Sequence, residues 1–190
     1  MVVLASEPVC VCGVDVAAPQ QVANRQTVID LCNRDVGVFT DAELVLLHAQ
    51  TPDEKEQLFR RLWSCKEAFV KARGDGLACE LNRAEFTEIE AISSTAFGAK
   101  VLFDGKPQPL WNFRIERLGG ALGNHYITVA RAPPLAIVDA LGEFRATLEQ
   151  QEFPAPAWRD ALQAAWPAFE ELRVEQLDPG RPGAAAAVAT

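Results

Sequence analysis

The segment between Thr51 and Gly74 constrains the fold more than any other part of the chain, because it carries the signals of one long helix. Thr51 can cap the helix and Pro52 suits the first helical position. Asp53 and Glu54 favour the positive end of the helix dipole. Gly74 is a typical left-handed terminator. These signals predict a helix that spans the whole segment.

The side chains of this helix divide into two faces. Apolar residues recur at spacings of three and four, which predicts a stripe facing a core; they are Leu58, Leu62, Cys65, Phe69 and Ala72. The opposite face is predicted to be polar and consists of Arg60, Ser64, Glu67 and Lys71. Glu67 and Lys71 are four residues apart, so they project from the same side of the helix.

The remaining sequence predicts strands and shorter helices around this helix. Stretches with strand-like patterns are 1–5, 9–16, 84–89, 99–103, 111–116 and 125–130, and Asp104–Pro107 predicts a turn. Further helices are expected over 24–33, from residue 40 onward with Thr40 and Glu43 as a capping box, over 135–151 and over 158–172. The last three strands suggest an antiparallel meander. The expected fold class is therefore α+β, a small antiparallel sheet packed on a long helix.

The charge distribution limits the classes of partner. The net charge of −8 argues against a nucleic-acid binder. Between Lys55 and Arg73, however, six basic residues stand against two acidic ones, so one element can still attract anions. No run reaches the about 18 apolar residues needed to cross a membrane. Five cysteines without a Cys-x-x-Cys pair suggest reduced thiols in a cytosolic protein and argue against zinc.

Four residues have the chemistry to bind a phosphate-bearing substrate: Asp15, Lys66, Glu67 and Lys71. Carboxylates can hold a divalent cation, while the ammonium groups of the lysines attract an anion. Taken alone, a Glu–Lys pair at this spacing is usually an ordinary surface salt bridge. The wider pattern favours function.

Three motifs in order resemble the signature of 4'-phosphopantetheinyl transferases. They occupy residues 13–16, 39–43 and 63–77, and their matching positions are Gly13, Asp15, Phe39, Glu43, Trp63, Lys66, Glu67, Ala68, Lys71, Ala72, Gly74, Gly76 and Leu77. Further stretches at 77–86, 102–105, 111–113 and 125–130 are similar to a eukaryotic branch of the two-lobe, surfactin-synthetase-type enzymes. The resemblance covers roughly residues 1–132, the expected transferase lobe. Residues 133–175 are expected to form a helical extension and 176–190 a disordered tail.

The resemblance implies a reaction and a role for each residue. Coenzyme A would donate 4'-phosphopantetheine to a serine of an acyl or peptidyl carrier protein, with Mg²⁺ neutralising the pyrophosphate. Asp15 and Glu67 would ligate Mg²⁺, and Glu67 would also deprotonate the serine. Lys71 would bind a coenzyme A phosphate, and Lys66 would support the same site.

Two departures from the family pattern are visible. Many two-lobe members have a third acid two residues after the aspartate, where this chain has Ala17. The sequence also begins at the strand that would follow the first lobe, so the serine–histidine motif and most of the coenzyme A contacts of that lobe are expected to be missing.

Two interpretations therefore stay open. In the first, the chain is an enzyme that rebuilds the missing half-site as a homo-oligomer. In the second, it is an inactive lobe or fragment that acts as a binding module. For Glu43, the helix-capping role explains the residue without any part in catalysis. Trp158 and Trp166 are expected to dock the C-terminal segment onto the lobe.

Overall fold

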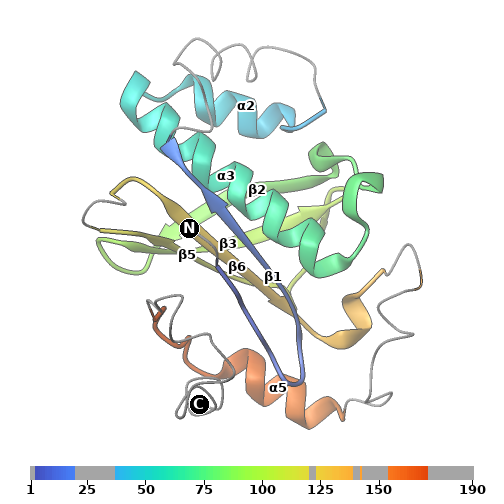
Figure 1. Ribbon diagram of the computed structural model, residues 1–190. Coiled ribbons are helices and arrows are strands. Elements are labelled where there is room, and N and C mark those ends of the chain that lie inside the picture. The colour runs from blue at the N-terminus through green and yellow to red at the C-terminus, as the bar shows by residue number, and fades with distance from the viewer. Residues whose placement is uncertain (1–2, 20–36, 120–122, 139–141, 143–153, 171–190) are drawn as a thin grey trace.

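The computed structural model describes residues 3–19, 37–119, 123–138, 142 and 154–170. These residues form an antiparallel sheet with helices on both faces, as Figure 1 shows. The α+β prediction is confirmed. The elements are β1 (Val11–Ala17), α2 (Asp41–His48), α3 (Pro52–Arg73), η2 (Gly76–Ala78), η3 (Leu81–Arg83), β2 (Ala84–Ala91), β3 (Ala96–Phe103), β4 (Lys106–Pro107), β5 (Asn112–Arg117), β6 (Tyr126–Ala132), η5 (Pro134–Ala136) and α5 (Ala155–Gln163).

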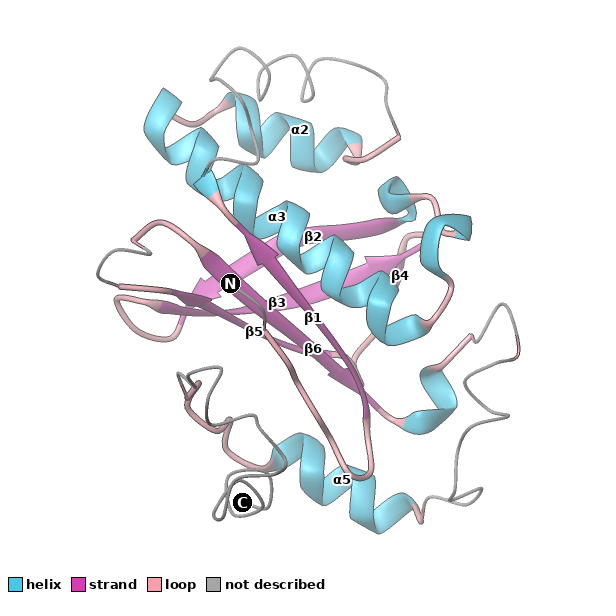
Figure 2. Cartoon of the chain, viewed as in Figure 1, coloured by secondary structure: helices cyan, strands magenta, loops and turns pink. Residues whose placement is uncertain are grey.

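The strands of the described residues follow the order β1-β6-β5-β3-β2, with the two-residue β4 beside β3. Every pairing is antiparallel, and β3, β5 and β6 form the predicted meander (Figure 2). The β3–β4 turn has a positive φ at both Asp104 (50°) and Gly105 (71°). This combination matches the right-handed twist of a hairpin, and it fixes Phe103 opposite Lys106.

Helix α3 begins and ends where the sequence predicts. The carboxylate of Glu54 accepts a hydrogen bond from the backbone N–H of Thr51 at 3.2 Å. Gly74 has φ 78° and donates its N–H to the carbonyl oxygen of Val70, which ends the helix. Helix α2 has the predicted capping box, because the hydroxyl of Thr40 accepts from the N–H of Glu43 while the Glu43 carboxylate accepts from the N–H of Thr40.

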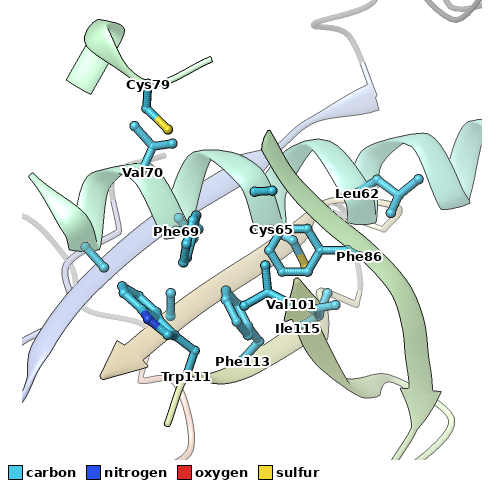
Figure 3. Close-up of a cluster of buried hydrophobic side chains, with 14 of the residues drawn as sticks. Leu62, Cys65, Phe69, Val70, Cys79, Phe86, Val101, Trp111, Phe113 and Ile115 are labelled. Carbon is cyan, nitrogen blue, oxygen red and sulfur yellow. The ribbon is translucent and has the colours of Figure 1, made fainter. Parts of the chain in front are cut away.

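The core lies between α3 and the sheet. Phe69 is completely buried and contacts four other rings, with its ring centroid 4.5 Å from that of Trp111 (Figure 3). The predicted apolar stripe of α3 supplies this layer: Leu62, Cys65, Phe69 and Ala72 are buried, and Leu58 is partly buried. The burial of these rings supplies a large share of the hydrophobic stabilisation of the fold.

The predicted polar face of α3 is only partly exposed to solvent. Arg60 and Ser64 are buried, in contrast to the prediction. Arg60 donates to the carbonyl oxygen of Asn124 at 2.8 Å, and Ser64 lies against β1. The helix therefore contacts the sheet over more than its apolar stripe, and of its predicted polar face only Glu67 and Lys71 reach solvent.

The other face of the sheet is covered by α5 (Figure 1). Trp158 is buried there, and Asn112 of β5 donates from its side chain to the carbonyl oxygen of Leu162 at 3.1 Å. The guanidinium of Arg131 lies 3.6 Å from the centre of the Trp166 ring. The prediction that Trp158 and Trp166 dock this segment is confirmed.

Some sequence predictions fail or cannot be compared. Residues 3–7 form no strand; Glu7 instead accepts a hydrogen bond from the side chain of Arg131 at 3.0 Å. At the start of the helix predicted over 135–151, residues 135 and 136 lie in the short η5 and Ile137 is extended. The helix predicted over 158–172 begins earlier and ends at Gln163, and residues 164–170 are not helical. The helix predicted over 24–33, the remainder of 135–151 beyond residue 138 except residue 142, and the tail 176–190 lie outside the described residues. No helix in the described ranges is long and apolar enough to cross a membrane.

Candidate active site

Asp15 is placed by a close contact between β1 and α3. A Cβ atom added to Gly13 would lie 2.2 Å from the carbonyl oxygen of Ala68 and 2.4 Å from the backbone nitrogen of Ala72. Only glycine allows the strand to approach the helix backbone so closely. Asp15 is two residues further along β1, so its side chain points to the same face and meets the surface of α3.

Asp15 contacts two turns of α3. The Lys71 ammonium lies 2.7 Å from Oδ1 of Asp15, and the hydroxyl of Ser64 lies 3.5 Å from the backbone oxygen of Asp15. The side chain of Asp15 is only 12% exposed, whereas that of Lys71 is 49% exposed. Oδ2 of Asp15 is buried and has no hydrogen-bond partner among the described residues. This oxygen is therefore free to act as a ligand.

Glu67 belongs to the same group of charges. Partial burial raises the pKa of the Glu67 carboxyl, and the negative charge of Asp15 raises it further, whereas Lys71 lowers it. Two carboxylates that influence each other in this way repel, and a cation between them would remove that repulsion. The structure thus brings together three of the four predicted residues: Asp15 from β1, and Glu67 and Lys71 from α3.

The chemistry of this group fits Mg²⁺. Magnesium prefers one or two carboxylates and completes its coordination with waters and substrate phosphates. Asp15 offers an unpartnered buried oxygen, and Glu67 offers a second, half-buried carboxylate. Ala17, on the same strand face, is buried and has no ligand atom. Any third ligand at that position must come from water or substrate.

The structure does not bring Lys66 to this group. Its ammonium is fully buried and lies 2.7 Å from Oε2 of Glu43, whose side chain is also fully buried. Burial lowers the pKa of Lys66, and the Glu43 carboxylate counteracts this effect. A contact between Lys66 and coenzyme A stays a prediction, and it would require the ammonium to leave its interior partners.

Two residues, Gly13 and Glu43, have a larger structural role than the sequence indicates. Gly13 is a motif position in the sequence, and a glycine within an alternating strand is itself a signal of close backbone approach. Glu43 does cap α2, as predicted, but it also accepts a hydrogen bond from the N–H of Phe86 at 2.8 Å and pairs with Lys66. Contacts between such distant positions leave no signal in a single sequence.

Comparison with known proteins gives a consistent family. The sequence model of the 4'-phosphopantetheinyl transferase superfamily matches residues 11–130. The 4'-phosphopantetheinyl transferase HetI of Nostoc sp. is 45% identical over 74 residues, which are 39% of this chain and 27% of HetI. The human L-aminoadipate-semialdehyde dehydrogenase-phosphopantetheinyl transferase is 29% identical over 137 residues, 70% of this chain and 43% of the human protein.

A third similar protein is also named a 4'-phosphopantetheinyl transferase. The 4'-phosphopantetheinyl transferase pptA of Paxillus involutus is 29% identical over 122 residues, 62% of this chain and 43% of pptA. The chain therefore spans less than half of the length of each of these relatives. The matched stretch includes β1 and α3, which carry Asp15, Glu67 and Lys71.

Proposed function

The chain belongs to the 4'-phosphopantetheinyl transferase superfamily, and from this premise we propose that it transfers 4'-phosphopantetheine from coenzyme A to a serine of an acyl or peptidyl carrier protein. The observation that carries the proposal is the contact of Asp15 on β1 with Lys71 on α3, one helical turn from Glu67. A cytosolic location, with the carrier protein as the macromolecular partner, is part of the same proposal.

Each of the three side chains has a role that its surroundings support. Asp15 and Glu67 would hold Mg²⁺, through the buried oxygen of Asp15 and the carboxylate of Glu67. When bound, Mg²⁺ supplies positive charge that neutralises the pyrophosphate of coenzyme A. Lys71 is half exposed, so its ammonium can bind a phosphate oxygen of the donor.

Glu67 is also suited to accept a proton. Its carboxylate lies one turn from Lys71 on α3 and is partly exposed, so an incoming hydroxyl group can reach it. In the proposed step, the serine hydroxyl oxygen attacks the β-phosphorus while Glu67 takes the hydroxyl proton. The bond between that phosphorus and the bridging oxygen breaks, and 3',5'-ADP leaves. The serine then carries the phosphopantetheine group.

The test is a transfer assay on the purified chain. The chain is incubated with Mg²⁺, coenzyme A and an apo carrier protein, and the mass of the carrier is measured. We expect a gain of one phosphopantetheine, and loss of this gain when Mg²⁺ is chelated. Glu67→Gln and Asp15→Asn should abolish the transfer, whereas Glu90→Gln, at an exposed position of β2, should not change it.

The same assay decides between the two interpretations of the chain. Activity at catalytic enzyme concentrations supports a self-sufficient transferase, and size measurements under the assay conditions then show whether the active species is a homo-oligomer. No mass gain even at equimolar enzyme would overturn the proposed activity for this chain and favour a binding module. Retained transfer in Glu67→Gln would refute the role given to Glu67.

A further inference from the structure

Lys66 and Glu67 are neighbours on α3, but their side chains have different partners. The Lys66 ammonium pairs with Oε2 of Glu43 at 2.7 Å and donates to the carbonyl oxygens of Leu81, at 3.0 Å, and Ala84. A lysine ammonium has three donors, and here three acceptors surround it. Its hydrogen-bonding capacity is used entirely inside the protein.

Glu43 connects this lysine to two further parts of the chain. Its carboxylate accepts from the N–H of Thr40 at 2.9 Å and from the N–H of Phe86 at 2.8 Å. The buried pair therefore joins three segments: the start of α2, the middle of α3, and residues 81–86, which comprise η3 and the beginning of β2. It does so at the turn of α3 that also carries Glu67.

A buried ion pair is a poor way to gain stability alone. The loss of hydration of both charges offsets their attraction, and a well-packed apolar pair of similar volume is often at least as stable. Hydrogen bonds differ from apolar packing in that they fix direction. Three such contacts, all made by Lys66, restrict both the rotation of α3 about its axis and its position along that axis, and two more fix their acceptor Glu43 to Thr40 and Phe86.

We propose that Lys66 and Glu43 are positioning residues, which hold α3 in the rotation that presents Glu67 and Lys71 to Asp15. This inference rests on the proposed transfer reaction for its functional reading. It gives Lys66 a role other than contact with coenzyme A. The rotation matters because the site is built from two elements, so Asp15 on β1 does not turn with the helix.

The required precision follows from helix geometry. Side-chain ends lie about 5–6 Å from a helix axis. A rotation of about 20° would thus displace the Glu67 carboxylate by roughly 2 Å relative to Asp15. A displacement of about 1 Å at a reacting group can already lower a rate about 100-fold. A small loss of rotational restraint is therefore enough to affect the transfer step.

The test compares two double variants that remove the same charges. Glu43→Gln with Lys66→Met removes the buried pair, while Glu88→Gln with Lys100→Met removes an exposed pair between β2 and β3. For each, kcat and the KM for coenzyme A are measured in the transfer assay. We expect the buried double variant to lose about 10- to 100-fold in kcat with its KM within about twofold of wild type. The exposed double variant should match wild type.

Two results would overturn the proposal. A large rise in the KM for coenzyme A with kcat unchanged would make Lys66 a substrate contact. Wild-type kcat and KM in the buried double variant would reduce the pair to a purely structural feature. If that variant does not fold, Glu43→Gln alone is used, because it is isosteric and keeps an acceptor oxygen for one of the two backbone N–H groups.

A structural readout separates this inference from the proposed function. If the wild-type chain transfers nothing, the proposed function fails, but positioning can still be measured in crystal structures of the wild-type chain and the folded variant. We expect the distance between Nζ of Lys71 and Oδ1 of Asp15 to increase beyond hydrogen-bonding range in the variant, from 2.7 Å. An unchanged distance would refute the positioning role.

Discussion

Gly13→Ala is the substitution that most directly tests how the site is assembled. The added methyl carbon would lie 2.2 Å from the carbonyl oxygen of Ala68 and 2.4 Å from the nitrogen of Ala72. Both atoms belong to the backbone of α3, so neither can rotate away as a flexible side chain would. The strand and the helix must separate instead.

The size of the effect follows from these distances. An ordinary contact begins at about 3.4 Å, so the oxygen contact must lengthen by the difference between 3.4 and 2.2 Å, about 1.2 Å. Overpacking of this kind costs about 1–3 kcal/mol of unfolding free energy. The same movement would lengthen the 2.7 Å contact between Lys71 and Asp15 towards or beyond the hydrogen-bond limit. Stability and metal affinity should fall together.

The assay is urea unfolding combined with Mg²⁺ titration of the folded chain by calorimetry. Gly98→Ala is the matched control, because Gly98 lies in β3 of the same sheet and a Cβ there would meet only ordinary contacts, the nearest at 3.6 Å from a side-chain atom of Ile92. The control should be unchanged or more stable by about 0.4–1 kcal/mol. Equal stability and equal Mg²⁺ affinity in the two variants would refute the close-contact reasoning.

Three further outcomes are expected. Burial and the charge of Asp15 raise the pKa of Glu67 above its usual 4.5, so the folded chain keeps a proton that the unfolded chain releases, and the contribution of Glu67 to the unfolding free energy should fall as the pH rises from about 4.5 through the folded pKa. The difference in unfolding free energy between the wild-type chain and Glu67→Gln, measured in urea, should show this slope, and a difference that does not change with pH would count against it. Thr40→Ala removes the hydroxyl that accepts from the N–H of Glu43 and should cost about 1 kcal/mol in chemical denaturation, whereas no loss would show that the cap is dispensable. Trp158→Ala should cost about 3–5 kcal/mol because the ring is buried between α5 and the sheet, and a wild-type midpoint would mean that α5 does not contribute to the folded lobe.

Local signals made the helices of the site predictable from sequence. Thr51, Gly74 and the Thr40–Glu43 capping box act within a few residues of chain, and the structure confirms both helix starts and the end of α3. The meander was predictable because alternating apolar residues and the turn at Asp104 and Gly105 are also local. The motif that contains Glu67 and Lys71 lay on the helix expected for it.

Contacts between distant segments account for what the sequence did not reveal. Arg60 and Ser64 look polar by periodicity, but their burial depends on how closely β1 and the β5–β6 connection approach α3. The partner of Lys66 is equally hard to predict from sequence, because a lysine beside a motif glutamate suggests a phosphate contact. Its true partner in the structure, Glu43, is 23 residues away in sequence and on another helix.

The two faces of the sheet each carry a buried tryptophan, Trp111 beside Phe69 under α3 and Trp158 under α5. Their fluorescence therefore reports on two different layers of the same small lobe. Single Trp→Phe replacements at these positions would separate the signals and show whether the C-terminal helix detaches before the aromatic core opens. Such spectra would measure how strongly the face that carries the site depends on the face that does not.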